Sequence, residues 1–183
     1  GAQVNYAQQV SRHVSQAHAA GMPAIIGTNE RGQRQELSWP ELRRQAAALA
    51  LHLLAHGVVP GDRVAAYLPN IPQTMVAFLA VVSVGGVWSV CAPDMGTNAV
   101  LDRFAQITPT VLIGCDGVTY GGKDHPRTDV LAQLRDALPS VTHTLLCRVL
   151  GSGDTLDGAA DWDSIVARND AAVAAFEPLW LPF

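Results

Sequence analysis

The chain has 183 residues, of which 49% are hydrophobic and 15% are charged, enough apolar material for one compact globular domain. Its formal net charge of −4 and its pI near 5.8 do not suit a nucleic-acid partner, which needs clustered Lys and Arg, so we expect small-molecule partners. The apolar stretches are shorter than the roughly 20 residues of a membrane-spanning helix, and no secretory signal pattern opens the chain, so neither membrane insertion nor export is expected.

Two features of the sequence bear on its origin. Gly1 and Ala2, which no Met precedes, are interpreted as a cloning remnant, and residues 3–183 as a single α/β domain.

The chain has three cysteines, and this odd number without C-x-x-C spacing is typical of a reducing cytoplasm. Buried, inert thiols are the default expectation, and a thiol or metal site at one sheet edge is the alternative, because each cysteine ends or nearly ends a predicted strand. The three are Cys91, Cys115 and Cys147.

The first third of the chain predicts a helix, a hairpin and a second helix. Apolar residues at helical spacing predict the first helix over residues 4–17. Residues 24–39 contain two short apolar segments around a Gly-containing turn, which predicts a β-hairpin. Ser38 is placed to cap the next helix, with Glu41 three residues later, and Gly57 ends it.

The chain then alternates between strands and helices. Helices separate the predicted strands, one opened by Asn70 with Pro72 and another capped by Thr128. Because the strand segments are apolar throughout, they indicate a parallel sheet covered on both faces, as in a βαβ subdomain of the α/β class. The strands are predicted at residues 64–68, 87–91, 111–115 and 143–149.

The last part of the chain is more irregular. Residues 151–161 contain three glycines and are interpreted as a solvated loop, which a final helix over 162–168 follows. Residues 176–183 form a strongly apolar tail. We expect this tail to pack as a strand at a sheet edge or to mediate self-association, because large apolar side chains are costly to leave in water.

One segment partly matches a phosphate-binding loop. Residues 117–123 follow the pattern G-x-x-x-x-G-K after a predicted strand, and Lys123 is the only lysine of the chain. However, Asp124 stands where a hydroxyl should bind magnesium, and Pro126 interrupts the helix that should follow. A plain turn with a surface lysine is therefore the main interpretation, and a nucleotide loop the alternative.

Other catalytic and metal motifs are not found in the sequence. His52 and His56 lie four residues apart on a predicted helix without a third ligand nearby in the sequence, so no zinc site is expected. No G-x-S-x-G elbow is present, and single acids such as Asp94 and Asp116 have no identifiable partner. The sequence therefore predicts no metal site and no catalytic residue.

Several longer motifs carry a family resemblance. Residues 37–46 and 60–70 together resemble the opening of the adenylate-forming superfamily, which contains acyl-CoA synthetases, luciferases and the adenylation domains of peptide synthetases. Residues 86–96, 100–107 and 120–124 resemble, more narrowly, the acetoacetyl-CoA synthetases within that superfamily. The resemblance extends from about residue 5 to the end of the chain.

The resemblance implies an ATP-dependent acid–thiol ligase that uses Mg²⁺ and CoA. In that family a carboxylate becomes an acyl-adenylate with release of pyrophosphate, and the CoA thiol then displaces AMP. The family's phosphate loop, its ribose- and magnesium-binding acids and its C-terminal lysine have no counterpart here. The resemblance therefore implies an inactive N-terminal fragment of the large N-terminal domain, cytoplasmic, with acetoacetate as the acid.

The same resemblance implies six CoA-binding residues. The pantetheine arm is expected near the backbone of Asp94, Met95 and Gly96. The CoA nucleotide is expected near the turn that contains Gly121, Gly122 and Lys123. Relatives often carry an Arg just before the Tyr of that turn, whereas this chain has Thr119, so one phosphate-binding guanidinium is missing.

Three hypotheses remain open at the level of sequence. The first is the ligase fragment, the second a free-standing α/β module that binds a ligand or partner without catalysis, and the third a small phosphate-loop hydrolase. A reading frame that continues past residue 183 with a Ser/Thr/Gly-rich loop would favour the first hypothesis, and a native stop there the second. Magnesium-dependent ATP hydrolysis would favour the third.

Overall fold

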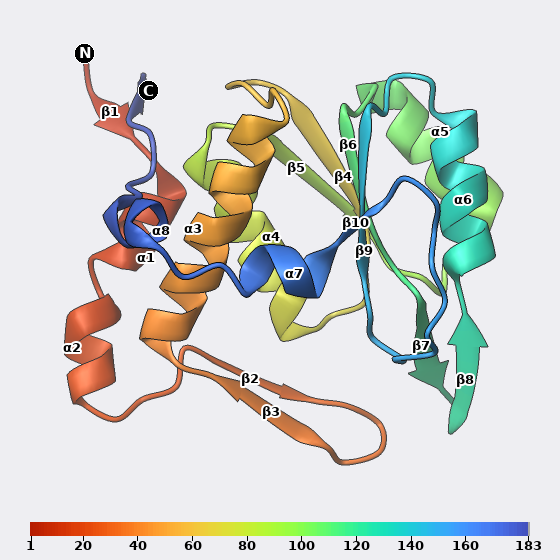
Figure 1. The fold of residues 1–183 in the computed structure, drawn as a ribbon, viewed down its shortest axis with the longest axis horizontal. Helices are drawn as coiled ribbons and strands as arrows, with labels where there is room; N and C mark the ends of the chain where they lie inside the picture. Colours follow the sequence, from red (N-terminus) through yellow and green to blue (C-terminus); the bar gives the residue numbers. More distant parts are fainter. Residues whose placement is uncertain (183) are drawn as a thin grey trace. The chain divides into compact units, whose positions relative to one another are not determined.

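The computed structural model of the chain describes residues 1–182 (Figure 1). These residues group into two compact units. The first unit contains Gly1–Gly61, Ile71–Val87 and the chain from Ser164 onward, and the second contains Asp62–Asn70 and Trp88–Asp163. Among the described residues, no helix combines the length and the apolar character that are needed to cross a membrane.

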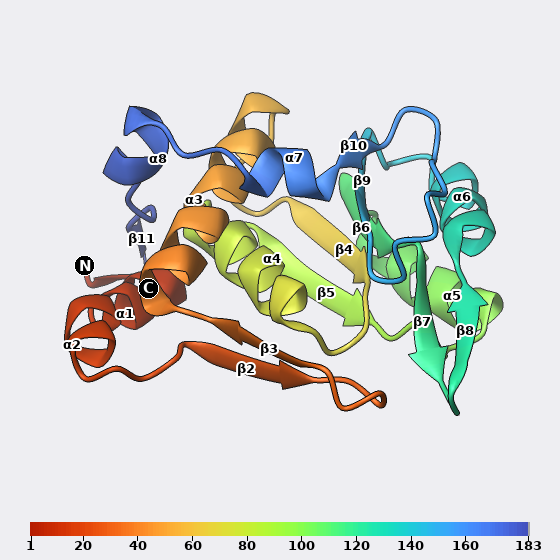
Figure 2. The same cartoon turned by 60° about the horizontal axis from the view of Figure 1, so that its bottom comes forward.

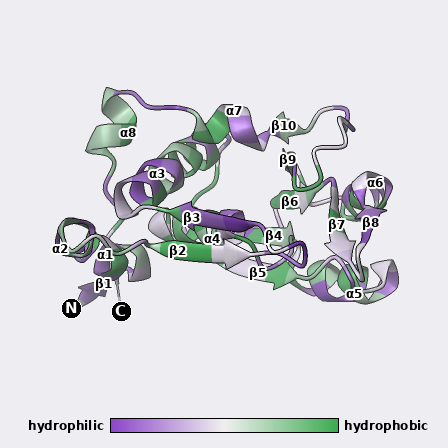
Figure 3. Cartoon of the chain, turned by 90° about the horizontal axis from the view of Figure 1, so that it is seen from below, coloured by the Kyte–Doolittle hydropathy of each residue, from purple (hydrophilic) through white to green (hydrophobic). Residues whose placement is uncertain are grey.

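The first unit is mainly helical and carries a β-hairpin. Its longest helices, α3 and α4, pack against each other, with α1 on α4 and with α2 and α8 on α3 (Figures 1 and 2). The predicted hairpin is confirmed, with β2 partly hydrophobic and β3 hydrophilic in Figure 3. The elements are α1 (Tyr6–Ser11), α2 (Val14–Ala19), β2 (Ile25–Thr28), β3 (Arg34–Leu37), α3 (Trp39–Ala55), α4 (Pro72–Ser83) and α8 (Ala171–Ala175).

The single helix predicted over residues 4–17 is wrong, because the structure has two short helices there. The backbone N–H of His13 donates to the carbonyl of Val10, three residues back, at 3.1 Å. This bond tightens the last turn of α1, and a new helix then begins with the bond from Ala17 N–H to the carbonyl of His13. The apolar period is the same on both sides of the break, so periodicity alone does not reveal it.

Asn5 joins the start of the first unit to parts of the chain that are distant in sequence. Its side-chain oxygen caps α1 by accepting from the N–H of Ala7 at 2.8 Å. Its amide nitrogen donates to the carbonyls of Val82 and Leu179, both at 2.8 Å. The side chain is buried, so these bonds satisfy polar groups that would otherwise be costly inside the protein.

The predicted cap of α3 is confirmed. The hydroxyl of Ser38 accepts from the N–H of Glu41 at 3.4 Å, and Pro40 lies in the first turn. The helix ends at Ala55, before Gly57, whose φ of 83° lies in the left-handed region that favours glycine.

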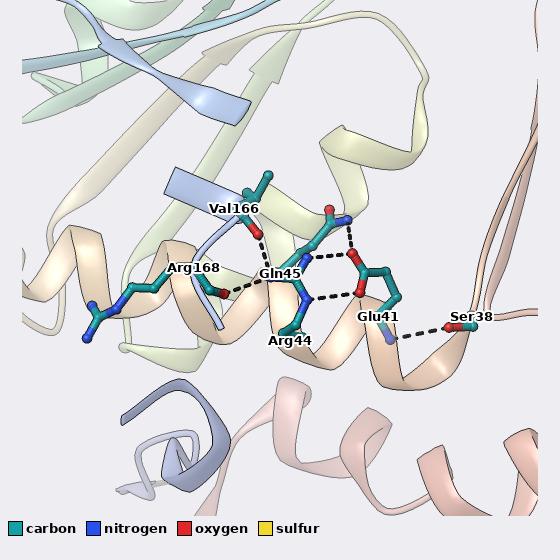
Figure 4. Close-up of polar contacts among 6 residues, drawn as sticks. All are labelled: Ser38, Glu41, Arg44, Gln45, Val166 and Arg168. Atoms are coloured by element: carbon teal, nitrogen blue, oxygen red, sulfur yellow. Dashed lines mark hydrogen bonds and ion pairs between the residues drawn. The ribbon is translucent and has the colours of Figure 1, made fainter. Parts of the chain in front are cut away.

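Arg44 on α3 links this helix to the last residue of α7 (Trp162–Val166) and to Arg168 beyond it, as Figure 4 shows. Its Nε and Nη2 atoms donate to the carboxylate of Glu41 at 2.9 and 2.5 Å, and Gln45 donates to the same carboxylate at 2.7 Å. Its Nη1 atom donates to the carbonyls of Val166 at 2.6 Å and Arg168 at 2.7 Å. One guanidinium thus satisfies carbonyl groups where a short helix ends.

The second unit contains a five-stranded parallel sheet, as predicted for the α/β class, in the order β10-β9-β6-β4-β5. β6 pairs with β4 on one side and with β9 on the other, and β10 extends the sheet beyond β9. The four predicted strands are present within one or two residues, and β10 is a short addition that was not predicted. The strands are β4 (Arg63–Tyr67), β5 (Val87–Cys91), β6 (Val111–Cys115), β9 (His143–Cys147) and β10 (Ala160–Asp161).

Helices α5 (Thr97–Ile107) and α6 (Thr128–Ala137) contribute to the core of this unit. Phe104 from α5 and Leu131 from α6 are fully buried in it together with residues of the sheet. Gly114 in β6 permits a close approach, since a Cβ atom there would lie 2.3 Å from Cδ1 of Leu131. The helix and the strand are therefore packed more tightly than any larger residue would allow.

Two further predictions about helices need correction. Thr128 does not cap α6, because the helix begins at Thr128 itself and Arg127 occupies the cap position without a side-chain hydrogen bond to the first turn of the helix. The final helix, α7, is shorter than predicted, and α8 follows it as a helix that the sequence did not indicate.

The apolar tail pairs in a way that was not predicted. Its short strand β11 (Leu181–Pro182) pairs antiparallel with β1 (Gln3–Val4), not with the edge of the five-stranded sheet. The N–H of Leu179 donates to the carbonyl of Ser83 at 2.8 Å. Trp180 is 44% exposed, and self-association through the tail stays a prediction. Residue 183 lies outside the described residues.

Candidate functional site

The strand order of the second unit indicates where a ligand would bind. The chain leaves β4 toward β5 at one edge of the sheet, and it leaves β6 toward β9 on the opposite side. β4 and β6 are neighbours, so the direction of the connections changes between them. In open parallel sheets this change leaves a crevice at the carboxyl ends of the strands, where ligands bind. The segments that follow β5 and β6 at this edge include all six residues predicted for CoA.

A backbone carbonyl anchors the segment after β5. The hydroxyl of Tyr67, at the end of β4, donates to the carbonyl of Pro93 at 2.9 Å. Nε of Arg127 donates to the same carbonyl at 2.8 Å. Burial raises the pKa of the Tyr67 hydroxyl, which moves it further above neutral pH, where the group is protonated and can donate. Two donors from two other segments thus fix the backbone just before Asp94.

The segment Asp94, Met95 and Gly96 forms a turn that leads into α5. The N–H of Met95 donates to the carbonyl of Ala92 at 3.1 Å, and Gly96 occupies the cap position of the helix. The Met95 side chain packs against the apolar core, while Asp94 and Gly96 are exposed. The turn is therefore anchored to the core by the Met95 side chain, while Asp94 and Gly96 are open to solvent.

The segment after β6 is a β-hairpin of β7 (Gly117–Tyr120) and β8 (Lys123–Pro126), visible in Figure 2. Gly121 and Gly122 form its two-residue turn with φ angles of 59° and 74°, the left-handed conformations that such hairpins require. Tyr120 pairs with Lys123 at the tip. A strand, β8, begins at Lys123 where a nucleotide loop would lead into a helix, so the nucleotide-loop alternative is wrong and the interpretation as a turn is confirmed.

Other side chains of the hairpin bond across its two strands. The hydroxyl of Thr119 donates to the carboxylate of Asp124 at 2.7 Å. A ring nitrogen of His125 lies 3.2 Å from the carbonyl of Tyr120. Lys123 and Tyr120 are exposed at the tip. The Asp124 carboxylate is thus hydrogen-bonded to Thr119 on the opposite strand. Its negative charge lies on the residue directly after Lys123.

Asp116, the first residue after β6, has a fully buried side chain at the same edge. One carboxylate oxygen accepts from the N–H groups of Val149 at 2.7 Å and Leu150 at 2.9 Å. The other oxygen accepts from the N–H groups of Gly151 at 2.9 Å and Ser152 at 3.3 Å. The loop after β9 thus wraps its backbone around one carboxylate, an arrangement that satisfies a buried negative charge.

The structure brings the two predicted CoA segments to one edge of one unit. Their connection is Arg127, which ends the hairpin and bonds to Pro93 just before Asp94. Sequence reasoning missed Tyr67, Arg127 and the role of Asp116. A signal existed for Asp116 alone, since an acidic residue directly after a buried parallel strand lies at the ligand-binding edge. That the six residues bind CoA stays a prediction.

The three cysteines are free and buried, as expected by default. Cys115 and Cys147 are register partners at the ends of β6 and β9, and Cys91 ends β5. Burial raises the pKa of the Cys115 thiol to about 12 and that of Cys147 well above its usual range. Protonated, enclosed thiols are poor nucleophiles and poor metal ligands, which favours the inert interpretation.

The first unit contains an apolar pocket. Its empty volume is about 430 Å³, including space open to solvent. Its lining includes Val10, Trp39, Leu42, Leu79 and Phe176, and none of the residues predicted for CoA.

Comparison with known proteins identifies the family. A family model described as AMP-binding enzyme matches residues 11–182. The chain belongs to the AMP-binding enzyme family. The resemblance inferred from the sequence motifs is therefore confirmed.

The relatives of this AMP-binding chain include several acyl-CoA synthetases. An acetoacetyl-coenzyme A synthetase of Rhizobium meliloti (strain 1021) is 36% identical over 97% of this chain and 27% of that protein. A malonamoyl-CoA synthetase of Penicillium aethiopicum is 32% identical over 82% of this chain and 21% of that protein. The solved structure of acetoacetyl-CoA synthetase from Streptomyces lividans has a TM-score of 0.90 and 44% identity, and the match covers all of this chain and 27% of that one. The chain thus spans about a quarter of the length of these relatives.

Proposed function

We propose that the chain is the N-terminal part of an ATP-dependent acid–thiol ligase that converts acetoacetate, CoA and ATP into acetoacetyl-CoA, AMP and pyrophosphate. Membership of the AMP-binding family and the similarity to acetoacetyl-CoA synthetases support this proposal. In this proposal residues 3–183 form part of the large N-terminal domain of the parent enzyme. The chain alone is inactive, and none of its described residues is assigned to ATP, to Mg²⁺ or to a catalytic step.

The contribution of this segment is to hold CoA for the second half-reaction. In that step the CoA sulfur attacks the carbonyl carbon of the acyl-adenylate, a carbon–sulfur bond forms, and AMP leaves with the electron pair of the broken carbon–oxygen bond. The observation that carries the assignment is the shared carboxyl edge, where Arg127 ties the base of the hairpin to Pro93. A CoA molecule placed there would have its pantetheine arm along Asp94, Met95 and Gly96.

The hairpin tip suits the nucleotide end of CoA. Gly121 and Gly122 have no side chains, and a Cβ atom at either position would meet nothing within 4 Å. A phosphate can therefore approach the backbone closely beside the exposed ammonium group of Lys123. Because this contact lies in water near Asp124, it should contribute only about 1 kcal/mol to CoA binding.

The test is Lys123→Ala in the complete parent enzyme, with Arg12→Ala as the control. Arg12 is also an exposed cation, and its side chain bonds only to the exposed Gln9 among the contacts described. We expect Lys123→Ala to raise the KM for CoA several-fold, about 1 kcal/mol, and to leave pyrophosphate release in the acyl-adenylate step unchanged. An unchanged KM for CoA, or equal damage to both half-reactions, would contradict the role of the hairpin tip.

A further inference from the structure

Asp116 supports both sides of the proposed CoA edge although it does not reach the solvent. Its backbone N–H donates to the carbonyl of Cys147 at 3.1 Å, and its own carbonyl accepts from the N–H of Arg127 at 2.7 Å. The second bond closes the base of the hairpin, because Arg127 directly follows β8. Its carboxylate accepts the four N–H groups of residues 149–152 described above. One residue thus holds two segments that leave the sheet at this edge.

The carboxylate also acts on the hairpin through Leu150. A Cβ atom at Gly117, the first residue of β7, would lie 2.4 Å from Cδ1 of Leu150 and 2.6 Å from the carbonyl oxygen of His125. The Leu150 side chain therefore rests directly on the backbone where the hairpin begins. The N–H of Leu150 is one of the groups that Asp116 binds, so the carboxylate fixes the side chain that supports the hairpin.

We propose that Asp116 is a positioning residue for CoA: its buried carboxylate holds the loop of residues 149–152, and with it Leu150 and the hairpin, so that Lys123 at the hairpin tip is placed for the ligand. This inference rests on the proposed function, which assigns CoA to this edge. Asp116 itself touches no part of the proposed ligand path. Its effect passes through Leu150 to Gly117 and through Arg127 to Pro93.

The chemistry of the site requires a carboxylate. Four backbone N–H groups converge on the two side-chain oxygen atoms, so both oxygens act as acceptors, as they do in a carboxylate. In Asp116→Asn one oxygen becomes an NH₂ group, which would face two N–H donors and repel them. The shape of the side chain is preserved, so the variant changes the hydrogen bonding and not the packing.

The experiment measures the two half-reactions of the complete parent enzyme separately. We expect Asp116→Asn to raise the KM for CoA about tenfold, the size typical of losing hydrogen bonds to a charged group. Acyl-adenylate formation, followed as pyrophosphate release without CoA, should stay within about twofold of the wild-type rate, because the edge residues take no part in it. Equal loss in both half-reactions would show that Asp116 serves only the fold and would overturn the proposal.

A second variant tests the same arrangement if Asp116→Asn does not fold. Gly151 has a φ of 67° and space for a methyl group, so Gly151→Ala strains one donor of the loop and keeps the carboxylate. Gly153 is the matched control, because it has a φ of 81° and equal space but does not donate to Asp116 in the structure described. We expect a higher KM for CoA in Gly151→Ala, by about two- to fivefold, and a wild-type value in Gly153→Ala. Equal values in the two variants would overturn the proposal.

The results distinguish this inference from the proposed function beneath it. If Lys123→Ala raises the KM for CoA and a folded Asp116→Asn does not, the positioning role is wrong and the CoA edge stands. If neither variant changes the KM for CoA, the positioning role of Asp116 and the assignment of CoA to this edge are both wrong. If both variants raise the KM for CoA while acyl-adenylate formation is unchanged, the positioning role and the CoA assignment are both supported.

Discussion

Replacing Arg44 by Met should destabilise the chain more than replacing any exposed arginine. Met retains the apolar part of the side chain and loses the guanidinium. Two carbonyl groups, of Val166 and Arg168, then lose a charged donor, and Glu41 loses its bidentate partner. The Arg44 side chain is only 22% exposed, so its hydrogen bonds count for more than those of a solvated pair.

The magnitude follows from these contacts. A hydrogen bond to a charged group is worth roughly 1.5–3 kcal/mol when it is protected, and the partly exposed ion pair with Glu41 adds at most about 1 kcal/mol. Because such contributions are not additive, we expect a loss of about 2–3 kcal/mol, which corresponds to about 5–10 °C in Tm for a chain of this size. Arg44→Lys should lose about half as much, since an ammonium group cannot reproduce the planar fork.

The assay is equilibrium unfolding in urea, with Arg34→Met as the matched control. Arg34 also pairs with a glutamate, Glu36, but their side chains are 58% and 50% exposed, so the control should lose less than about 0.5 kcal/mol. Equal losses for Arg44→Met and Arg34→Met would refute the reasoning, because the hydrogen bonds from Arg44 to the carbonyls of Val166 and Arg168 would then contribute nothing measurable.

The same network sets a dependence on pH. Hydrogen bonds from Arg44 lower the pKa of Glu41, with a smaller contribution from Gln45, and they outweigh the opposing effect of burial. A carboxylate whose pKa is lowered in the folded state stabilises the fold above its unfolded pKa and loses that contribution as pH falls through the folded value. The stability difference between wild type and Arg44→Met should therefore shrink between about pH 5 and pH 3. A difference that stays constant over this range would show that the ion pair does not contribute.

Three further outcomes are expected. Gly114→Ala should lower the free energy of unfolding by about 1–3 kcal/mol through overpacking against Leu131. In a double-mutant cycle, the same substitution should cost less in the Leu131→Ala background. A cost that does not depend on Leu131 would be inconsistent with this close contact. Cys115 and Cys147 should resist iodoacetamide in the folded chain and react on unfolding, because their buried thiols stay protonated; mass spectrometry that finds rapid native labelling would argue against this. Gly122→Ala should destabilise the hairpin by about 1 kcal/mol through its φ of 74°, seen as faster amide exchange in β7 and β8, and unchanged exchange rates would count against it.

The sequence predicted the strands of the sheet well, because each is an apolar segment bounded by turn residues. It could not predict the order β10-β9-β6-β4-β5, since periodicity describes one strand and not its neighbours. The hairpin β7–β8 was predicted only as a turn. The segment Lys123–Pro126 has charged residues and a proline, and it forms a strand because the turn of Gly121 and Gly122 brings it against β7.

The cap of α6 shows a different limit. Thr128 is a good cap residue by type, yet it lies inside the helix. The residue before it, Arg127, is held by its backbone bond to Asp116 and its side-chain bond to Pro93. These bonds set where the helix begins, and local preference has little influence. The same is true of the candidate site, where the carboxylate of Asp116 accepts from backbone N–H groups more than 30 positions further along the chain.

The way in which the first unit is assembled from separate parts of the sequence affects how the chain folds during synthesis. This unit is built from three stretches of sequence, and the bond from Asn5 to Leu179 joins residues 174 positions apart. At a typical rate of about 5–20 residues per second, the ribosome needs on the order of 10–35 s to make the second partner after the first. During that time α1 and its apolar face lack the tail segment against which they will pack. The segment around α1 is therefore the most exposed to misassociation, while the second unit, complete by residue 163, can already form its sheet.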